Sequence, residues 1–181
     1  MKTIKEKYYG TVIAEMKKKH KLENDLQVPK IEKVVVNVGI GKYLKDSNMV
    51  KDIVESVRAI TGQKPVMTKS RKSIAGFKIR EGLEVGIKVT LRGRRKWDFI
   101  ERLVKSALPR VRDFQGIKES AVDARGNMNI GIKEHTIFPE IVPENVKNIM
   151  SFQVNIATNA GNRERGLELF KLLEFPIEKK D

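Results

Sequence analysis

The sequence predicts an α+β fold, in which helices cover one face of a mainly antiparallel β-sheet and the other face stays open. Three observations favour this class. Several short segments alternate aliphatic with polar residues, whereas the segments between them repeat their aliphatic residues at helical spacing. Each expected helix has one apolar stripe, which is enough to cover the aliphatic face of a sheet. The 181 residues are 40% hydrophobic without a linker rich in Gly, Ser or Pro, so we expect a single domain over residues 1–181.

The first expected element is a helix that begins after Thr3. Thr3 and Glu6 have the spacing of a capping box, in which each side chain binds the backbone N–H of the other residue. Apolar residues then recur at every fourth position, at Ile4, Tyr8, Val12 and Met16. The basic run at residues 17–21 ends the helix. This run either complements the negative end of the helix dipole or contacts phosphate, and the two roles are compatible.

A strand is expected over residues 31–40. One of its faces consists of Val34, Val36, Val38 and Ile40, and the opposite face carries Lys33, Val35 and Asn37. The next segment repeats its apolar residues with a period of about 3.6, which predicts a helix. Asp46 or Ser47 can cap this helix, and Gly62 stands where a left-handed residue would end it.

The clearest strand pattern covers residues 83–92. Its aliphatic face has Leu83, Val85, Ile87, Val89 and Leu91, and its other face has Glu84, Gly86, Lys88, Thr90 and Arg92. A shorter strand is expected near residues 66–70, and a basic loop joins the two. A helix over residues 94–108 ends at Pro109. Two further strands are expected around residues 128–132 and 154–156, and a last helix begins near Asn162.

Positive charge is concentrated in one part of the chain. Residues 64–96 contain eleven Lys or Arg and two acids, or +9 of the total +14, whereas residues 97–181 are balanced. A local field of this sign favours a polyanionic partner, of which nucleic acid is the commonest. An open polar sheet face suits RNA, which is recognised through backbone, 2′-hydroxyl groups and exposed bases. A basic surface that serves only solubility is the alternative.

Other classes of site are disfavoured. The chain has no Cys and only two His, far apart in sequence, so we expect no metal and no cofactor. Gly39 and Gly41 invite comparison with a nucleotide-binding loop, but the known glycine-rich motifs are incomplete and a tight turn fits better. We find no nucleophile near a base, and therefore expect neither an enzyme nor a small-molecule substrate. The charged N-terminus and short apolar runs predict no signal peptide and no membrane partner.

The loop over residues 69–80 combines five cations with Gly76 and an apolar tip formed by Ile74 and Phe77. Such a loop, flexible at its glycine, can lie along a phosphate backbone while its tip presses on a sugar or base. The alternative is a disordered hairpin tip whose apolar residues pack locally.

Residues 62–82, GQKPVMTKSRKSIAGFKIREG, closely resemble the bacterial form of the large-subunit ribosomal protein five family, the 5S rRNA-binding proteins. Shorter segments resemble the same family in order: KVVVNVG at 33–39, KVTLRG at 88–93, PRVRDFQG at 109–116, DARGN at 123–127 and IFPE at 137–140. Together they cover nearly the whole chain.

The resemblance implies a cytoplasmic, structural component of the large ribosomal subunit, placed in the central protuberance beside neighbouring ribosomal proteins. It further implies binding of 5S rRNA and 23S rRNA, and an extended loop that reaches the P-site tRNA. The matching rRNA-binding positions are Lys33, Asn37, Gln63, Lys64, Thr68, Lys69, Ser70, Arg71, Lys88, Thr90 and Arg92. The matching tRNA-contacting loop is Lys72, Ser73, Ile74, Ala75, Gly76, Phe77, Lys78, Ile79 and Arg80.

Two other functions would use the same basic face. A free-standing RNA chaperone or regulator would stay mostly in the soluble fraction, whereas a ribosomal protein would sediment with large subunits. An RNA-directed enzyme would leave a modified or cleaved RNA, although we find no nucleophile for it in the sequence.

Overall fold

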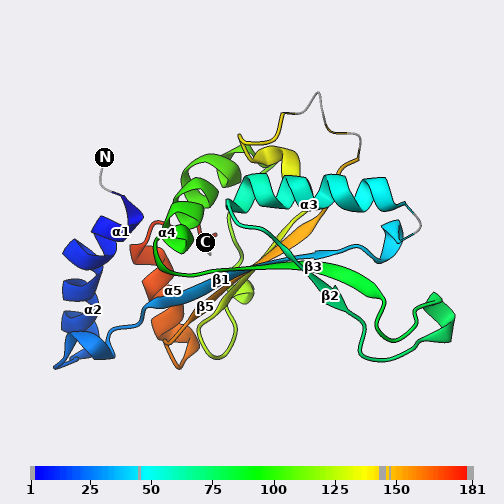
Figure 1. Ribbon diagram of the computed structural model, residues 1–181. Helices are drawn as coiled ribbons and strands as arrows, with labels where there is room; N and C mark the ends of the chain where they lie inside the picture. Colours follow the sequence, from blue (N-terminus) through cyan, green and yellow to red (C-terminus); the bar gives the residue numbers. More distant parts are fainter. Residues whose placement is uncertain (1–2, 45, 143–145, 147, 179–181) are drawn as a thin grey trace.

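A five-stranded sheet runs through the middle of the computed structural model, which describes residues 3–44, 46–142, 146 and 148–178 (Figure 1). The strand order is β2-β3-β1-β5-β4. The strands are β1 (Ile31–Gly39), β2 (Val66–Lys69), β3 (Glu84–Leu91), β4 (Met128–Ile132) and β5 (Phe152–Thr158). Every neighbouring pair is antiparallel. The expected α+β class is therefore confirmed.

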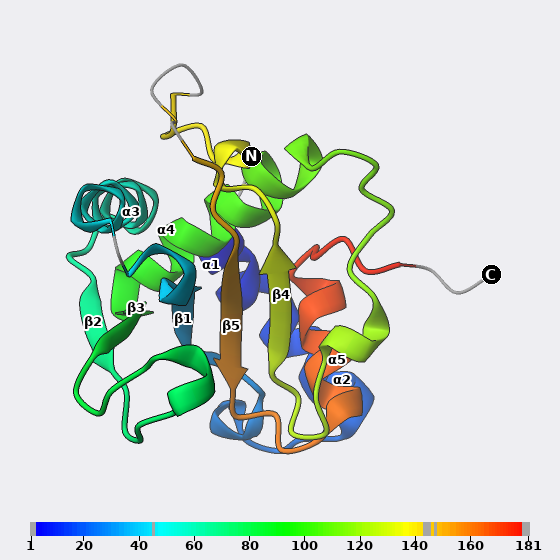
Figure 2. The ribbon, with the colours of Figure 1, turned by 90° about the vertical axis from the view of Figure 1, so that its right-hand side faces the viewer.

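The helices gather on one side of this sheet. They are α1 (Ile4–Lys7), α2 (Ile13–His20), α3 (Ser47–Thr61), α4 (Gly93–Arg102) and α5 (Arg163–Leu172). Figure 2 shows α1, α2, α4 and α5 behind the strands, with α3 above β2 and β3. The face of the sheet that is turned toward the viewer in Figure 2 carries no helix. This one-sided cover is the arrangement that the single apolar stripes predicted.

The alternation in the strands separates the two faces as expected. On β1 the side chains of Val34, Val36 and Val38 are buried, whereas Asn37 is exposed and Lys33 is half-buried. The strand register aligns the buried residues of neighbouring strands. Val36 lies opposite Val89 on β3 and Val154 on β5, and both of these are also buried. The inward side chains of the central strands and the helix stripes form one continuous hydrophobic core.

Local signals at the helix ends agree with the sequence. Thr3 and Glu6 form the expected capping box. At the start of α3, Asp46 rather than Ser47 is the cap, and its carboxylate accepts from the N–H groups of Asn48 and Met49, both at 3.1 Å. Gly62 ends α3 with φ of +66°, the left-handed conformation that glycine adopts without strain.

The structure explains why the apolar residues at the N-terminus recur at every fourth position. A π-helical turn, Tyr8–Val12, separates α1 from α2. An α-helix has about 3.6 residues per turn, so a strict repeat of four would drift away from one face. The wider π turn compensates for this drift. As a result, Ile4, Tyr8, Val12 and Met16 all remain buried.

The basic run that ends α2 is largely engaged within the protein. Lys17 pairs with Asp25 at 2.6 Å, and Lys19 pairs with Glu168 of α5 at 2.5 Å. The Nε2 of His20 lies 2.7 Å from the other carboxylate oxygen of Glu168. Although burial opposes the effect, the bonds from Lys19 and His20 hold the pKa of Glu168 below its usual value. Lys19 and His20 therefore join α2 to α5, in addition to any effect of the run on the helix dipole.

Substitutions on the two faces of the sheet should differ in their cost to stability. Val89→Ala should lower the free energy of unfolding by about 2 kcal/mol, because it removes two buried methyl groups and leaves a cavity. Thr90→Ala and Asn37→Ala change the uncovered face and should each cost less than about 0.5 kcal/mol. Urea titration of the three variants measures these differences. A large loss for Thr90→Ala with none for Val89→Ala would mean that the faces are inverted.

Candidate RNA interface

The helix-free face of the sheet presents polar side chains in cross-strand rows. We call it the open face. In one row, Asn37 of β1 lies opposite Lys88 of β3 and Gln153 of β5, and all three are exposed. In the next row, Val35 lies between Thr90 and Asn155. The open face therefore offers a nearly flat set of hydrogen-bond donors and acceptors across neighbouring strands.

Five of the rRNA-binding positions expected from the sequence lie on this face. Lys33 and Asn37 belong to β1, and Lys88 and Thr90 belong to β3. Thr68 of β2 faces Gly86 of β3. A Cβ atom at Gly86 would lie 2.7 Å from the Thr68 hydroxyl, so a larger residue at this position would force the Thr68 side chain to move. The structure brings these five positions onto one surface.

The other expected positions lie at two ends of that surface. Gln63, Lys64 and Arg92 are found where the end of α3, the start of β2 and the start of α4 meet. Lys69 ends β2. Ser70 and Arg71 belong to the loop after β2 rather than to the sheet, where the N–H of Ser70 donates to the carbonyl of Leu83 at 2.7 Å.

Sequence reasoning left several neighbouring residues out of the site. Gln153, Asn155 and Asn129 continue the open face onto β5 and β4, and the side-chain amide of Asn155 donates to that of Asn129. The alternation of polar and aliphatic residues along β5 and β4 predicted that these side chains face outward. It could not predict that β5 and β4 lie beside β1 in the sheet. Arg94 and Arg95 were assigned only to a helix. Because α4 begins at Gly93, both stand exposed beside the edge of the sheet.

Not every cation near the open face is available to a partner. The Nζ of Lys96 donates to the carbonyl of Ile31 and lies 5.2 Å from the centre of the Trp97 ring. Burial and the nearby charge of Lys30 lower the pKa of Lys96. In contrast, Lys88, Lys64 and Arg92 are exposed, and their side chains have no acidic or hydrogen-bonding partner among the residues described.

The loop between β2 and β3 forms a hairpin that is closed by its own backbone hydrogen bonds. The N–H groups of Ile74 and Ile79 each donate to the other's carbonyl, at 2.8 and 3.1 Å. A 3₁₀ turn, Ala75–Phe77, closes the tip, and Lys78 adopts φ of +56°. Phe77 is 75% exposed and Ile74 47% exposed, so the alternative of local packing is wrong for this tip. Figure 1 shows the hairpin projecting from the body of the molecule.

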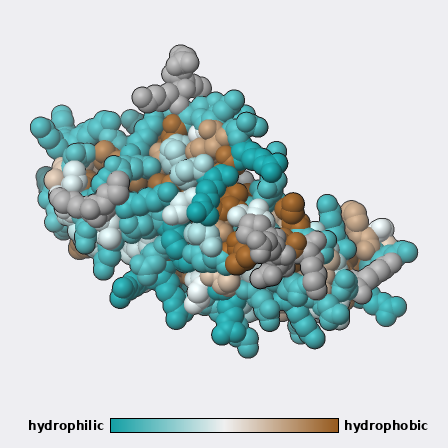
Figure 3. Space-filling model, turned by 90° about the horizontal axis from the view of Figure 1, so that it is seen from above, coloured by the Kyte–Doolittle hydropathy of each residue, from teal (hydrophilic) through white to brown (hydrophobic). Residues whose placement is uncertain are grey.

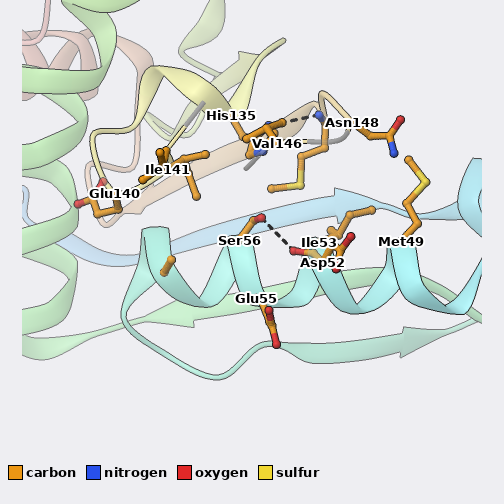
Figure 4. A pocket seen from close by; sticks show the side chains of 13 residues that line it. Met49, Asp52, Ile53, Glu55, Ser56, His135, Glu140, Ile141, Val146 and Asn148 are labelled. Carbon is orange, nitrogen blue, oxygen red and sulfur yellow. Dashed lines mark hydrogen bonds between the residues drawn. The ribbon is translucent and has the colours of Figure 1, made fainter. Parts of the chain in front are cut away.

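A hollow between α3 and the segment that holds His135, Ile141 and Met150 lacks catalytic groups that act together (Figure 4). The hydroxyl of Ser56 donates to the carbonyl of Asp52 at 2.9 Å. The Nδ1 of His135 accepts from the N–H of Met150 at 3.3 Å, and burial lowers the pKa of His135. The side chains of Ser56 and His135 are thus each bound to a backbone group and not to each other.

The segment Gly41–Tyr43 is a short turn between β1 and α3, as expected for a connection rather than a phosphate loop. In the described ranges, no group of three or more His, Cys, Asp or Glu could hold a metal ion, and no helix is long and apolar enough to cross a membrane. Seen from above α3 and α4, the surface is mostly hydrophilic with small apolar patches (Figure 3).

Comparison with known proteins gives matches in both halves of the chain. Residues 24–80 match the family model for ribosomal protein L5, and residues 84–177 match the model for the C-terminus of the same family. The chain is 46% identical over 179 residues to the large ribosomal subunit protein uL5 of Shewanella sp. (strain ANA-3), covering 99% of this chain and 100% of the relative. It is 44% identical over 173 residues to the uL5 of Colwellia psychrerythraea (strain 34H / ATCC BAA-681), covering 96% of each. The chain therefore belongs to the ribosomal protein L5 family, whose members are structural, non-enzymatic components of the ribosome.

Proposed function

We propose that the protein, as a structural component of the large ribosomal subunit, binds 5S rRNA through its open face and reaches P-site tRNA with its hairpin. Family membership supports a place in the large subunit in the cytoplasm, with rRNA and ribosomal proteins as partners. Within that subunit, the central protuberance, with its 23S rRNA and neighbouring proteins, is the location that the resemblance implies.

The observation that carries the 5S rRNA proposal is the row of Lys88, Asn37 and Gln153 across three adjacent strands. An A-form RNA helix has a wide, shallow minor groove that displays 2′-hydroxyls and base edges. A flat sheet face can lie on such a surface, and amide and hydroxyl side chains can bind 2′-hydroxyls. Exposed cations beside them, such as Lys64 and Arg92, can neutralise the adjoining phosphates.

The hairpin supports a second, separate contact. Lys72, Lys78 and Arg80 supply positive charge, and Phe77 and Ile74 supply an exposed apolar tip. Stacking of a base on an aromatic ring contributes about 1–3 kcal/mol and tolerates any base. Because the hairpin is closed by its own hydrogen bonds, its tip can meet a second RNA without disturbing the sheet. A tRNA held beside the subunit is the partner that the family resemblance suggests.

Binding to isolated 5S rRNA should weaken steeply as salt is added. If about 6–10 phosphates are neutralised, the affinity should fall roughly 10³–10⁵-fold between about 50 and 200 mM salt, on the scale for duplex DNA. The double variant Lys88→Gln with Arg92→Gln should reduce the slope of log K against log salt by roughly 1.4–1.8. Filter binding over a salt series gives both quantities. A nearly flat profile would contradict binding to a phosphate backbone.

Shortening the hairpin should separate the two RNA contacts. We expect a chain that lacks residues 73–78, bridged by glycines, to fold and to enter large subunits, because loops of this kind contribute little to the core. Its affinity for 5S rRNA should stay within about twofold, since the open face is intact. Retention of P-site tRNA on ribosomes that carry it should fall.

A full-length control, Phe77→Ser, separates the contribution of the apolar tip to tRNA retention from that of the hairpin's positive charge. It keeps all cations, so we expect a smaller loss of tRNA retention than in the shortened chain. If 5S rRNA affinity collapses in the shortened chain while tRNA retention is normal, then the hairpin belongs to the 5S rRNA site and the proposed division is wrong.

A further inference from the structure

A short segment after α5 lies against the connection between α4 and β4. We call residues 174–178 the strap and residues 111–118 the connection. Ile117 and Ile177 form an isolated parallel β-bridge between them. Figure 2 shows the strap, in red, leaving α5 toward the connection that follows α4. Two segments that are far apart in the sequence are thus paired through their backbones.

Both backbone groups of Ile117 are used in this pairing. Its N–H donates to the carbonyl of Pro176 at 2.7 Å, and its carbonyl accepts from the N–H of Glu178 at 3.0 Å. On the strap, the side chain of Phe175 is buried, and its ring meets the ring of Phe170 on α5 edge to face, with centres 5.1 Å apart. The strap is therefore anchored by one aromatic side chain and closed by two backbone hydrogen bonds.

Gly116 makes the close approach of the strap possible. It has φ of +116°, a conformation that residues with a side chain rarely adopt. A Cβ atom at this position would lie 2.9 Å from the backbone nitrogen of Glu178 and 3.0 Å from its Cα. These are backbone atoms, so they cannot move aside unless the strap moves with them. A side chain at Gly116 would therefore displace the strap.

The strap begins at a turn that also contacts the N-terminal helices. Glu174 has φ of +62°, so the chain leaves α5 through a left-handed residue. The carboxylate of Glu174 pairs with the Nζ of Lys7 on α1. The Glu174 side chain is 59% exposed, and an exposed ion pair contributes little free energy and is screened by salt. This pair is thus a weak link between α1 and the strap.

The connection has other contacts that do not involve the strap. Just beyond it, the carbonyl of Glu119 accepts from the guanidinium of Arg163 at 2.9 Å, and the Glu119 carboxylate pairs with Lys171 at 3.0 Å. Both of these partners belong to α5. Val111 and Phe114 pack against the hydrophobic core. These contacts would keep the connection attached to the core if the strap opened.

We infer that the strap is a clasp that opens and closes as a unit without unfolding of the sheet, and that its closure over Gly116 fixes the backbone of the connection. Glu174 is the hinge, and its pair with Lys7 biases the clasp toward the closed form. Opening breaks two backbone hydrogen bonds and exposes Phe175, but leaves the strand pairing intact, so it costs less than global unfolding. The inference uses no residue of the open face or of the hairpin.

Native-state hydrogen exchange, followed by NMR, tests the opening. The amides of Ile117 and Glu178 should have protection factors at least about 100-fold lower than those of Val36 and Val89 in the sheet. Low concentrations of urea should hardly change the exchange of the first two amides, because opening the strap exposes little surface. Exchange of the sheet amides should rise with urea. If all four amides share one protection factor and one urea dependence, the strap does not open by itself and the inference is overturned.

Gly116→Ala should open the clasp, because the new Cβ would meet the backbone of the strap. Protection of the Ile117 and Glu178 amides should fall about tenfold or more, whereas that of the sheet amides should stay within about twofold. Gly82→Ala is the matched control. Gly82 also has a positive φ, +83°, but a Cβ there would meet no atom within 4 Å. An equal loss at strap and sheet amides in Gly116→Ala, or a loss at the strap in Gly82→Ala, would overturn the inference.

The effect on the connection is measured separately, at Arg112. This residue is exposed, and its neighbour Asp113 has φ of +52°. The NMR order parameter of the Arg112 amide should fall from about 0.85, typical of rigid backbone, to below about 0.6 in Gly116→Ala. An unchanged order parameter would mean that the other contacts alone fix the connection, and would overturn this part of the inference.

Glu174→Asn tests the link to α1. Asparagine tolerates the left-handed conformation but carries no charge. Protection of the Ile117 and Glu178 amides should fall about two- to fivefold at low salt, and added salt should then have little further effect. Lys7→Met should give the same fall, and the double variant should be no worse than either single variant, because both changes remove one ion pair. If Lys7→Met leaves these amides unchanged at low salt, the bias from α1 is wrong.

Discussion

The one-sided burial of the sheet is the constraint on which the rest of this structure depends. Along β1 and β3, aliphatic residues at alternate positions are mostly buried, and the residues between them mostly face outward. Side chains in a strand alternate with a period of two, so a slip of one residue would move the aliphatic set onto the solvent face. Register is therefore tightly specified, and the same register aligns Asn37 with Lys88 and Gln153. Stability and the arrangement of the open face have one physical cause.

The helices make this arrangement possible by closing the core from one side only. Aromatic side chains join distant parts of the chain beneath the sheet: Phe99 of α4 stacks on Phe138 with ring centres 5.9 Å apart, and Phe138 contacts Phe152 of β5 at 5.8 Å. The N-terminal helices are fastened through Glu168 to α5, near the other end of the chain. Since these contacts lie behind or beside the sheet, the open face is not needed for packing and can be polar.

The charges of the protein fall into two groups with different roles. Lys17, Lys19 and Lys96 bind groups of the protein itself and hold elements together. The cations of the hairpin, Lys88 on the open face, and Lys64 and Arg92 beside it have no such partners in the described chain, and their repulsion is tolerated because they are solvated. A net charge count treats both groups alike. The distinction between structural and available cations is what makes the basic window between residues 64 and 96 a candidate interface rather than only a source of solubility.

The sequence by itself determined the elements, their faces and the position of the excess charge, because alternation, helical period and caps are local properties of the chain. It placed Val34, Val36 and Val38 inside, Asn37 and Thr90 outside, and the apolar tip of the hairpin at Ile74 and Phe77. Strand order and contacts between distant residues were decided only in three dimensions, since they depend on how separate segments pack. Only the tertiary structure placed Gln153 beside Asn37, engaged Lys19 with Glu168, and brought Arg95 to the amide of Gln63. The partners in these pairs lie far apart in the chain, so no local pattern could have revealed them.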